Sequence, residues 1–353
     1  ALLTPNGPLG PDAFNHLARG VISLRQHGVH VILVSSGAIA QGRIIRQLAD
    51  PPKTLSASQA LAALGQPQLM SLWAQALNPL HIAQFLLSQA DIDDPLRSFN
   101  AQRALYELEE IGVVPIGNEN DTVATDEIRI GDNDSLGAHI ARVCHADLLG
   151  LLTQVDGLYT SNPERDPTAQ KIEIISADQD VSDHAGGSAR DGWGKGGMVT
   201  KIRAAEIARR ANIPTLIGHG SIPLLDLISD PQRGSFFEVE HCAPHPLWQR
   251  WPVHGEVLIS EESFNSLRYE APLLLNAVLQ VNGHFQRGDL IELSVSGHGS
   301  TQRIGRCLTA YGSAELKRLS TGESGRSERD LKALIGDGYD GPLCYPLEYV
   351  LYP

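Results

Sequence analysis

The chain has 353 residues, a formal net charge of −13 and a hydrophobic share of 42%. This length exceeds what one ordinary core accommodates, so we expect two domains. The sequence shows no apolar run approaching about eighteen residues, and it does not open with a basic stretch followed by an apolar one, so it predicts neither a membrane span nor a secretory signal. We therefore expect a cytoplasmic protein. The negative charge opposes binding to a nucleic-acid backbone and favours a small-molecule ligand.

The cysteines are few and widely spaced, without a C-x-x-C pair; they are Cys144, Cys242, Cys307 and Cys344. This spacing argues against a disulfide framework and against a zinc site built from thiolates. We expect reduced, mostly buried cysteines and no metal site made of protein ligands alone.

Apolar segments alternate with segments of helical periodicity along the first two thirds of the chain. The apolar segments are rich in Val, Ile and Leu, which is typical of buried parallel strands, and lie at residues 29–34, 81–87, 113–116, 147–153 and 214–217. Apolar residues at helical spacing predict helices at residues 11–27, 56–77, 97–110, 135–144 and 200–211. The alternation predicts a three-layer α/β sandwich with a mainly parallel central sheet.

The last third of the chain differs in composition. Prolines and tryptophans cluster in residues 238–251, where we place a linker between a first domain at 1–237 and a second at 252–353. Short strands with glycine-containing turns are predicted at residues 256–259, 277–281, 290–295 and 304–310. This pattern is typical of a small β-barrel.

Residues 118–134 form the most informative segment, because seven of these seventeen positions are Asp or Asn and they follow an apolar strand. Asx-turns explain one such pair but explain the whole cluster less well. Asn118, Asp121 and Asn133 are candidates to hold the ammonium and carboxylate groups of an amino acid. Asp134 is a candidate to orient a lysine or to help hold a magnesium ion, since a bare carboxylate beside a transferring phosphate would itself repel it.

A second candidate site segment lies at residues 34–40, Val-Ser-Ser-Gly-Ala-Ile-Ala, between a buried strand and a helix. Small residues there allow an anionic ligand to approach backbone N–H groups at the start of the helix, and the serine hydroxyls add donors. Ser36, Gly37 and Ala38 are therefore candidate substrate-binding residues. An ordinary serine N-cap followed by a packing glycine explains the same letters equally well.

Two further segments suit a nucleotide. The strand at residues 151–153 runs into an Asp-Gly turn, and its end at Thr153 and Gln154 can receive an adenine ring, although a plain strand and type I turn would look the same. A glycine loop then leads into a helix, without Walker A spacing. Its backbone amides and lysines are candidate phosphate ligands, with a simple hinge as the alternative; they are Lys195, Gly196, Gly197, Met198 and Lys201.

These motifs, in this order, resemble the amino acid kinase superfamily, in particular its glutamate-phosphorylating branch. The segments that carry the resemblance are residues 34–40, Gly65-Gln66, 118–124, 131–134, 151–153, 156–160, Gly196-Gly197-Met198 and Thr200-Lys201. Residues 281–285, Arg287-Gly288-Asp289 and Tyr311 are similar to the PUA domain of bacterial members of that branch.

The resemblance implies transfer of the γ-phosphoryl group of ATP, with Mg²⁺, to the side-chain carboxylate of L-glutamate, the first step of proline biosynthesis. Ser36, Asp121 and Asn133 would bind glutamate. Thr153 and the segment at 195–201 would bind ATP. A carboxylate acceptor is ionised at neutral pH, so no general base is required.

The resemblance also implies catalysis by positioning and charge stabilisation. Lys201 would neutralise the phosphates, and Asp134 would keep lysine side chains aimed at the transferring group. Proline is the expected feedback inhibitor, and a homo-oligomer, a dimer or a tetramer, is the expected assembly.

The sequence departs from this family in three places. Relatives begin with a Val-rich strand that ends in a lysine, and we expect a truncated start because Ala1 aligns within the following glycine loop. Gln154 stands where an acidic residue is usual, and Lys195 where threonine is commoner. The alternative to a kinase is a non-catalytic amino-acid sensor, or an RNA-binding protein acting through the PUA-like part, which the net charge disfavours.

Overall fold

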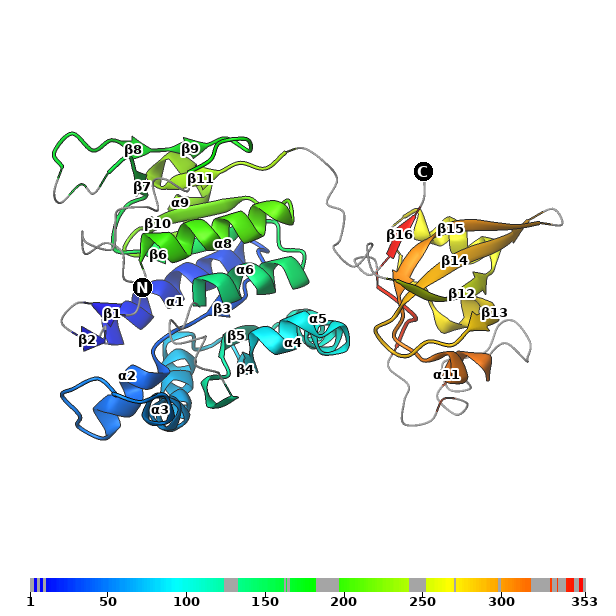
Figure 1. Ribbon diagram of the computed structural model, residues 1–353, viewed down its shortest axis with the longest axis horizontal. Helices are drawn as coiled ribbons and strands as arrows, with labels where there is room; N and C mark the ends of the chain where they lie inside the picture. Colours follow the sequence, from blue (N-terminus) through cyan, green and yellow to red (C-terminus); the bar gives the residue numbers. More distant parts are fainter. Residues whose placement is uncertain are drawn as a thin grey trace. The chain divides into compact units, whose positions relative to one another are not determined.

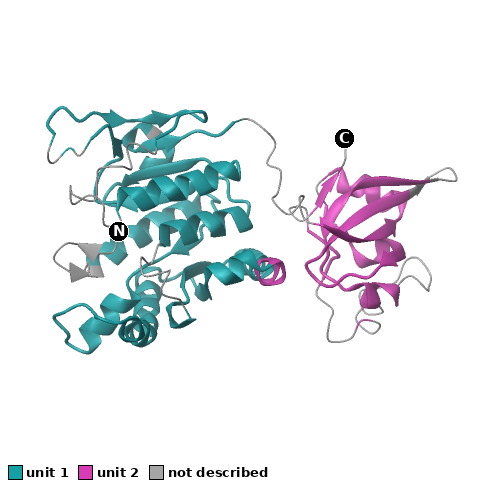
Figure 2. Ribbon diagram, viewed as in Figure 1, with its two compact units in different colours: residues 1–94, 101–244 teal, residues 95–100, 245–353 magenta. Residues whose placement is uncertain are grey.

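The computed structural model describes residues 3–4, 7–8, 11–123, 133–161, 163, 166–181, 197–240, 252–269, 271–297, 300–318, 331, 335, 341–345 and 349–351 (Figure 1). It divides into two compact units, the first comprising residues 1–94 and 101–244 and the second 95–100 and 245–353 (Figure 2). Within the described ranges, no helix combines the length and the hydrophobicity that a membrane span requires.

A three-stranded parallel sheet forms one part of the first unit. Its central strand, β5 (Val114–Glu119), pairs in parallel with β3 (Leu33–Val34) on one side and with β4 (Ile82–Leu87) on the other. Five of the six residues of β5 are buried, which explains its uniformly apolar start.

A four-stranded sheet forms the other part. Here β6 (Leu149–Thr153) pairs in parallel with β10 (Thr215–His219), which pairs antiparallel with β11 (Ser235–Phe237), and β11 in turn pairs in parallel with β9 (Ile174–Ile175). The expected mainly parallel α/β architecture is confirmed. The described pairings nevertheless form two sheets where a single central sheet was predicted.

Helices cover both faces of the three-stranded sheet. On one face, α1 (Pro11–Gln26) and α3 (Leu55–Ala76) share a core with β5, in which the Phe14 and Trp73 rings meet edge to face at 5.0 Å. On the other face, α5 (Pro95–Glu110) and α6 (Asn133–Val143) pack against side chains of β3 and β4. Alternate residues of each strand point to opposite faces, so both cores draw on the same strands.

Helix α6 also connects the two sheets. A Cβ added at Gly137 would lie 3.9 Å from both Val34 of β3 and Leu149 of β6, so the helix crosses over both strands. Helix α8 (Met198–Arg210) packs beside α6 and shares a core with β6 and β10. The first turns of α6 and α8 therefore lie close to the strand ends that carry the predicted site residues.

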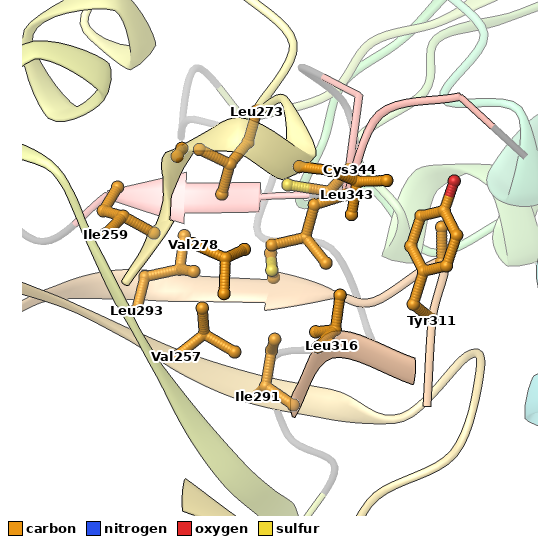
Figure 3. Close-up of a cluster of buried hydrophobic side chains, with 14 of the residues drawn as sticks. Val257, Ile259, Leu273, Val278, Ile291, Leu293, Tyr311, Leu316, Leu343 and Cys344 are labelled. Atoms are coloured by element: carbon orange, nitrogen blue, oxygen red, sulfur yellow. The ribbon is translucent and has the colours of Figure 1, made fainter. Parts of the chain in front are cut away.

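The second unit contains a five-stranded sheet in the order β13-β12-β14-β15-β16, where β12 and β14 are parallel and the other neighbours antiparallel. The strands are β12 (Val253–Ile259), β13 (Val278–Gly283), β14 (Leu290–Gly297), β15 (Ser300–Leu308) and β16 (Tyr349–Leu351). No pairing between β13 and β16 closes a barrel within the described residues. Side chains from both edges and the centre of the sheet fill its core (Figure 3).

Two helices of the first unit cross with almost no space between their backbones. A Cβ at Gly65 of α3 would overlap the carbonyl oxygen of Ala38 and the nitrogen of Gly42, both in α2 (Ala38–Ile45). Glycine at this position thus sets the distance between α3 and the start of α2.

We predict that Gly65→Ala destabilises the folded protein by roughly 1–3 kcal/mol or more, because the two backbones must separate to admit the methyl group. Urea unfolding, followed by circular dichroism, measures the change. Gly150→Ala is the matched control, since a Cβ at Gly150 meets nothing within 4 Å. Equal unfolding midpoints for the two variants would contradict the packing described.

Candidate active site

Ser36, Asn118 and Thr153 lie at or just after the carboxyl ends of β3, β5 and β6, which is where open α/β sheets bind ligands. The backbone N–H of Ser35 donates to the carbonyl of Gly117 at 2.9 Å, so the pairing of β3 with β5 continues one residue past β3. The buried Trp73 on α3 donates its indole N–H to Ser35 Oγ at 2.8 Å. This hydrogen bond holds the turn between β3 and α2 against α3. Ser36 is thereby held beside the end of β5.

Helix α2 begins directly after this turn. Gly37, its N-cap residue, has a φ of 124°, a backbone conformation that favours glycine, and no side chain caps the helix. The first N–H groups of α2 therefore have no side-chain acceptor at the N-cap. Ala38, the first helical residue, is buried, as the close packing of α3 requires.

A series of hydrogen-bonded side chains connects four elements next to this turn, and we call it the carboxamide ladder. It consists of Ser36, Asn133, Asn118, Gln66 and Gln84. Asn133 Nδ2 donates to Ser36 Oγ at 2.5 Å and to Asn118 Oδ1 at 2.9 Å. Asn118 Nδ2 donates to Gln66 Oε1 at 2.9 Å, and Gln66 Nε2 donates to Gln84 Oε1 at 3.1 Å. The structure thus brings together three of the predicted substrate residues.

An ion pair lies one residue further along α6. The Lys201 ammonium is 2.8 Å and 2.9 Å from the two carboxylate oxygens of Asp134, and Thr200 Oγ1 donates to the same carboxylate at 2.7 Å. Lys201 is only 8% exposed, so its side chain is largely shielded from water, while Asp134 remains partly exposed. The geometry leaves Asp134 positioned to orient Lys201, the role that the sequence suggested.

Asp121 begins a short 3-10 helix, η1 (Asp121–Val123), immediately after β5. Its carboxyl group is partly buried, and this burial raises the pKa of Asp121 above its ordinary value. The contact between η1 and α3 holds this residue near the helix that carries Gln66.

The residues predicted to bind the nucleotide lie at two elements of the four-stranded sheet. Thr153 ends β6, and its carbonyl accepts a hydrogen bond from Gly220 N at 2.9 Å, beyond the end of the neighbouring β10. Gln154 follows it and is exposed.

The other predicted nucleotide residues precede or open α8, which packs against β6. Gly197 is the exposed N-cap of α8, and Met198, its first residue, is buried. Lys195 and Gly196 lie outside the described residues. Within the described part of the chain, no group of three or more His, Cys, Asp or Glu side chains could hold a metal ion.

Four participating residues were not predicted as site residues: Gln66, Gln84, Thr200 and Trp73. Gln84 carried a detectable signal, because it is the single polar residue in the apolar strand β4. Thr200 and Gln66 stood in quoted motifs without an assigned role. Trp73 carried no signal, because a tryptophan on a helix is most simply a core residue.

Comparison with known proteins agrees with this arrangement. The model of the amino acid kinase family matches residues 1–219. The chain belongs to the amino acid kinase family.

Its curated relatives include proteins named glutamate 5-kinase. One from Thermus thermophilus is 38% identical over 347 residues, which span 96% of this chain and 91% of the relative. Those from Vibrio campbellii and Salinibacter ruber are 37% and 39% identical, covering 93% and 95% of this chain and 87% and 89% of each relative. The family resemblance expected from the sequence is confirmed.

The raised pKa of Asp121 predicts a pH-dependent effect on stability. Below the ordinary value of 3.8, Asp121 is protonated in the folded and unfolded states alike. As the pH rises through the raised pKa, the folded protein must ionise a partly buried carboxyl group and loses stability. We therefore expect Asp121→Asn to stabilise the protein more at pH 7 than at pH 4, as measured by paired urea unfolding.

Asp166→Asn provides a control of opposite sign. Hydrogen bonds from Ser161 and Thr168 lower the pKa of Asp166, so its carboxylate contributes stability above its ordinary pKa. The amide variant should therefore be less stable than the unsubstituted protein at both pH 4 and pH 7, and this difference should disappear only as the pH falls through the lowered pKa of Asp166. If the stability change caused by each substitution followed the same pH trend, burial would not be the cause of the raised pKa of Asp121.

Proposed function

We propose that this protein transfers the γ-phosphoryl group of ATP to the side-chain carboxylate of L-glutamate, forming glutamyl 5-phosphate as the first step of proline biosynthesis. The observation that carries this proposal is the start of α6, where Asn133 joins the carboxamide ladder and the next residue, Asp134, holds Lys201. A site for a small zwitterion and a cation for a phosphoryl group thus meet at one helix end. The relatives named glutamate 5-kinase support the same reaction.

Glutamate would bind at the turn between β3 and α2 and at the ladder. Ser36 and the backbone N–H groups of Gly37 and Ala38 offer donors to a carboxylate. Asp121 and Asn133 offer oxygen acceptors to the ammonium group. We propose Asn118 as the residue that holds Asn133 in place.

Catalysis would come from position and charge. Lys201, fixed by Asp134 and shielded from water, would stabilise negative charge on the transferring group more strongly than a solvated lysine could. The glutamate carboxylate is already ionised and attacks without a general base.

We propose that ATP binds where β6 ends and α8 begins. Thr153 and Gln154 would receive the base, and the loop residues Gly197 and Met198 the phosphates, together with Lys195 and Gly196. A Mg²⁺ ion would be held mainly by phosphate oxygens of the nucleotide. Such an ion would neutralise phosphate charge during transfer.

Several further properties belong to the same proposal. We place the kinase domain at 1–237, a linker at 238–251 and a PUA-like β-barrel domain at 252–353. We also propose feedback inhibition by proline at the glutamate pocket, assembly as a dimer or tetramer, and a cytoplasmic location.

The reaction predicts that the protein releases ADP from ATP and Mg²⁺ only when L-glutamate is present. A coupled ADP assay with and without excess L-glutamate tests this, and hydroxylamine traps the acyl phosphate product. L-aspartate is the control substrate, because its shorter side chain cannot bring its carboxylate to the same point. ADP release that ignores the amino acid would contradict the proposal.

The two ends of the site should respond differently to substitution. We expect Lys201→Ala or Asp134→Ala to lower kcat by roughly 100-fold or more with little change in the KM for glutamate, because their charge acts on the transferring group. Asp121→Ala should chiefly raise that KM. Steady-state kinetics separates the parameters, and Lys317→Ala in the second unit serves as the control. Equal changes in kcat and KM for all three variants would contradict these roles.

A further inference from the structure

We infer that Gln66 is a positioning residue that holds Asn118, and through it Asn133, in the orientation that presents an oxygen acceptor to the bound amino acid. This inference rests on the proposed function, because it assigns a specificity role within the glutamate site. It follows from the direction of each hydrogen bond in the carboxamide ladder.

The direction is fixed by a backbone group. The N–H of Glu119 can only donate, and it lies 2.9 Å from Asn118 Oδ1, so the oxygen of this carboxamide must face it. The Nδ2 group of Asn118 then points the other way, toward α3. Asn118 is only 3% exposed, and a buried N–H group needs an acceptor, which Gln66 Oε1 supplies at 2.9 Å.

The same direction passes on to Asn133. Asn118 Oδ1 accepts a second hydrogen bond from Asn133 Nδ2, whose other hydrogen is directed to Ser36 Oγ. Both N–H bonds of Asn133 are thus used within the protein. Its Oδ1 atom is buried and has no donor among the described residues. An ammonium group of a ligand can satisfy this acceptor, whereas a carboxylate cannot.

Gln66 is the part of the ladder that can hold this order in place, because it accepts from the buried Asn118 Nδ2 group. It is only 8% exposed, and its neighbour Gly65 allows α3 to pack tightly against α2. The backbone position from which the Gln66 side chain extends is therefore fixed. Gln84, at the outer end, is exposed and can turn its carboxamide to suit whatever Gln66 presents. We therefore expect the Gln66 acceptor to be required, while the Gln84 carboxamide adapts to it.

The experiment compares three variants of the protein by calorimetric titration without nucleotide. The ligands are L-glutamate and glutarate, which has both carboxylates but lacks the ammonium group. Gln66→Met removes the acceptor for Asn118 and should weaken L-glutamate binding about 10-fold or more, the usual effect of a lost hydrogen bond to a charged group. Glutarate binding should change less than about 3-fold, because it does not use the Asn133 acceptor.

Gln66→Glu is the rescue variant, since a carboxylate keeps an acceptor at the same place and the exposed Gln84 can donate to it. It should bind L-glutamate within about 3-fold of the unsubstituted protein, as should the matched control Gln75→Met, at an exposed position of the same helix α3. Simple charge repulsion predicts the reverse order, because a new carboxylate near an anionic ligand would weaken binding more than methionine does.

The outcomes separate this inference from the proposed function. Absence of L-glutamate binding by the unsubstituted protein would overturn both. If the unsubstituted protein binds L-glutamate, two results would overturn the positioning role alone. One is Gln66→Met binding L-glutamate with unchanged affinity, and the other is Gln66→Glu binding it more weakly than Gln66→Met. An equal loss for glutamate and glutarate would show that Gln66 merely supports the fold.

Discussion

The parallel pairing of β3 with β5 is the constraint on which the candidate site depends. Because this pairing continues to the hydrogen bond between Ser35 and Gly117, the residue after β3 and the end of β5 lie side by side. Ser36 and Asn118 are then close enough for one side chain, Asn133, to bridge them. A displacement of either strand by one residue would turn these side chains to opposite faces of the sheet and separate all three.

The start of α6 converts this local arrangement into a site with two ends. Successive residues of a helix point about 100° apart, so Asn133 and Asp134 can face different neighbours. Asn133 faces the ladder on the three-stranded sheet, while Asp134 faces Lys201 on α8. The crossing of α6 over Val34 and Leu149 fixes where this helix begins relative to both sheets. Packing of apolar side chains thus determines the separation between the proposed acceptor and phosphoryl positions.

The sequence predicted the elements and residues that have a local signal. Long apolar runs located β4, β6 and β10 within a few residues, and a polar cluster after an apolar strand located Asn118, Asn133 and Asp134. The two-residue strand β7 (Leu158–Tyr159) was not predicted, because two residues show no periodicity, whereas β3 lies at the end of the apolar run predicted at residues 29–34. The partition into two sheets depends on pairings between distant strands. The role of Gln66 could not be predicted for the same reason, since it depends on the direction of hydrogen bonds formed only after folding.

Several polar groups of this site are costly to the folded protein when no ligand is bound. The Asn133 Oδ1 atom is buried without a donor among the described residues, and burial opposes ionisation of Asp121. Each arrangement disfavours folding, and each is relieved by a positively charged group. Sites that retain such destabilising groups usually do so because the ligand requires them. A ligand that satisfies both acceptors gains affinity because these groups are already desolvated, and its binding also stabilises the fold. The groups that disfavour the ligand-free site are therefore those that would select for an ammonium group.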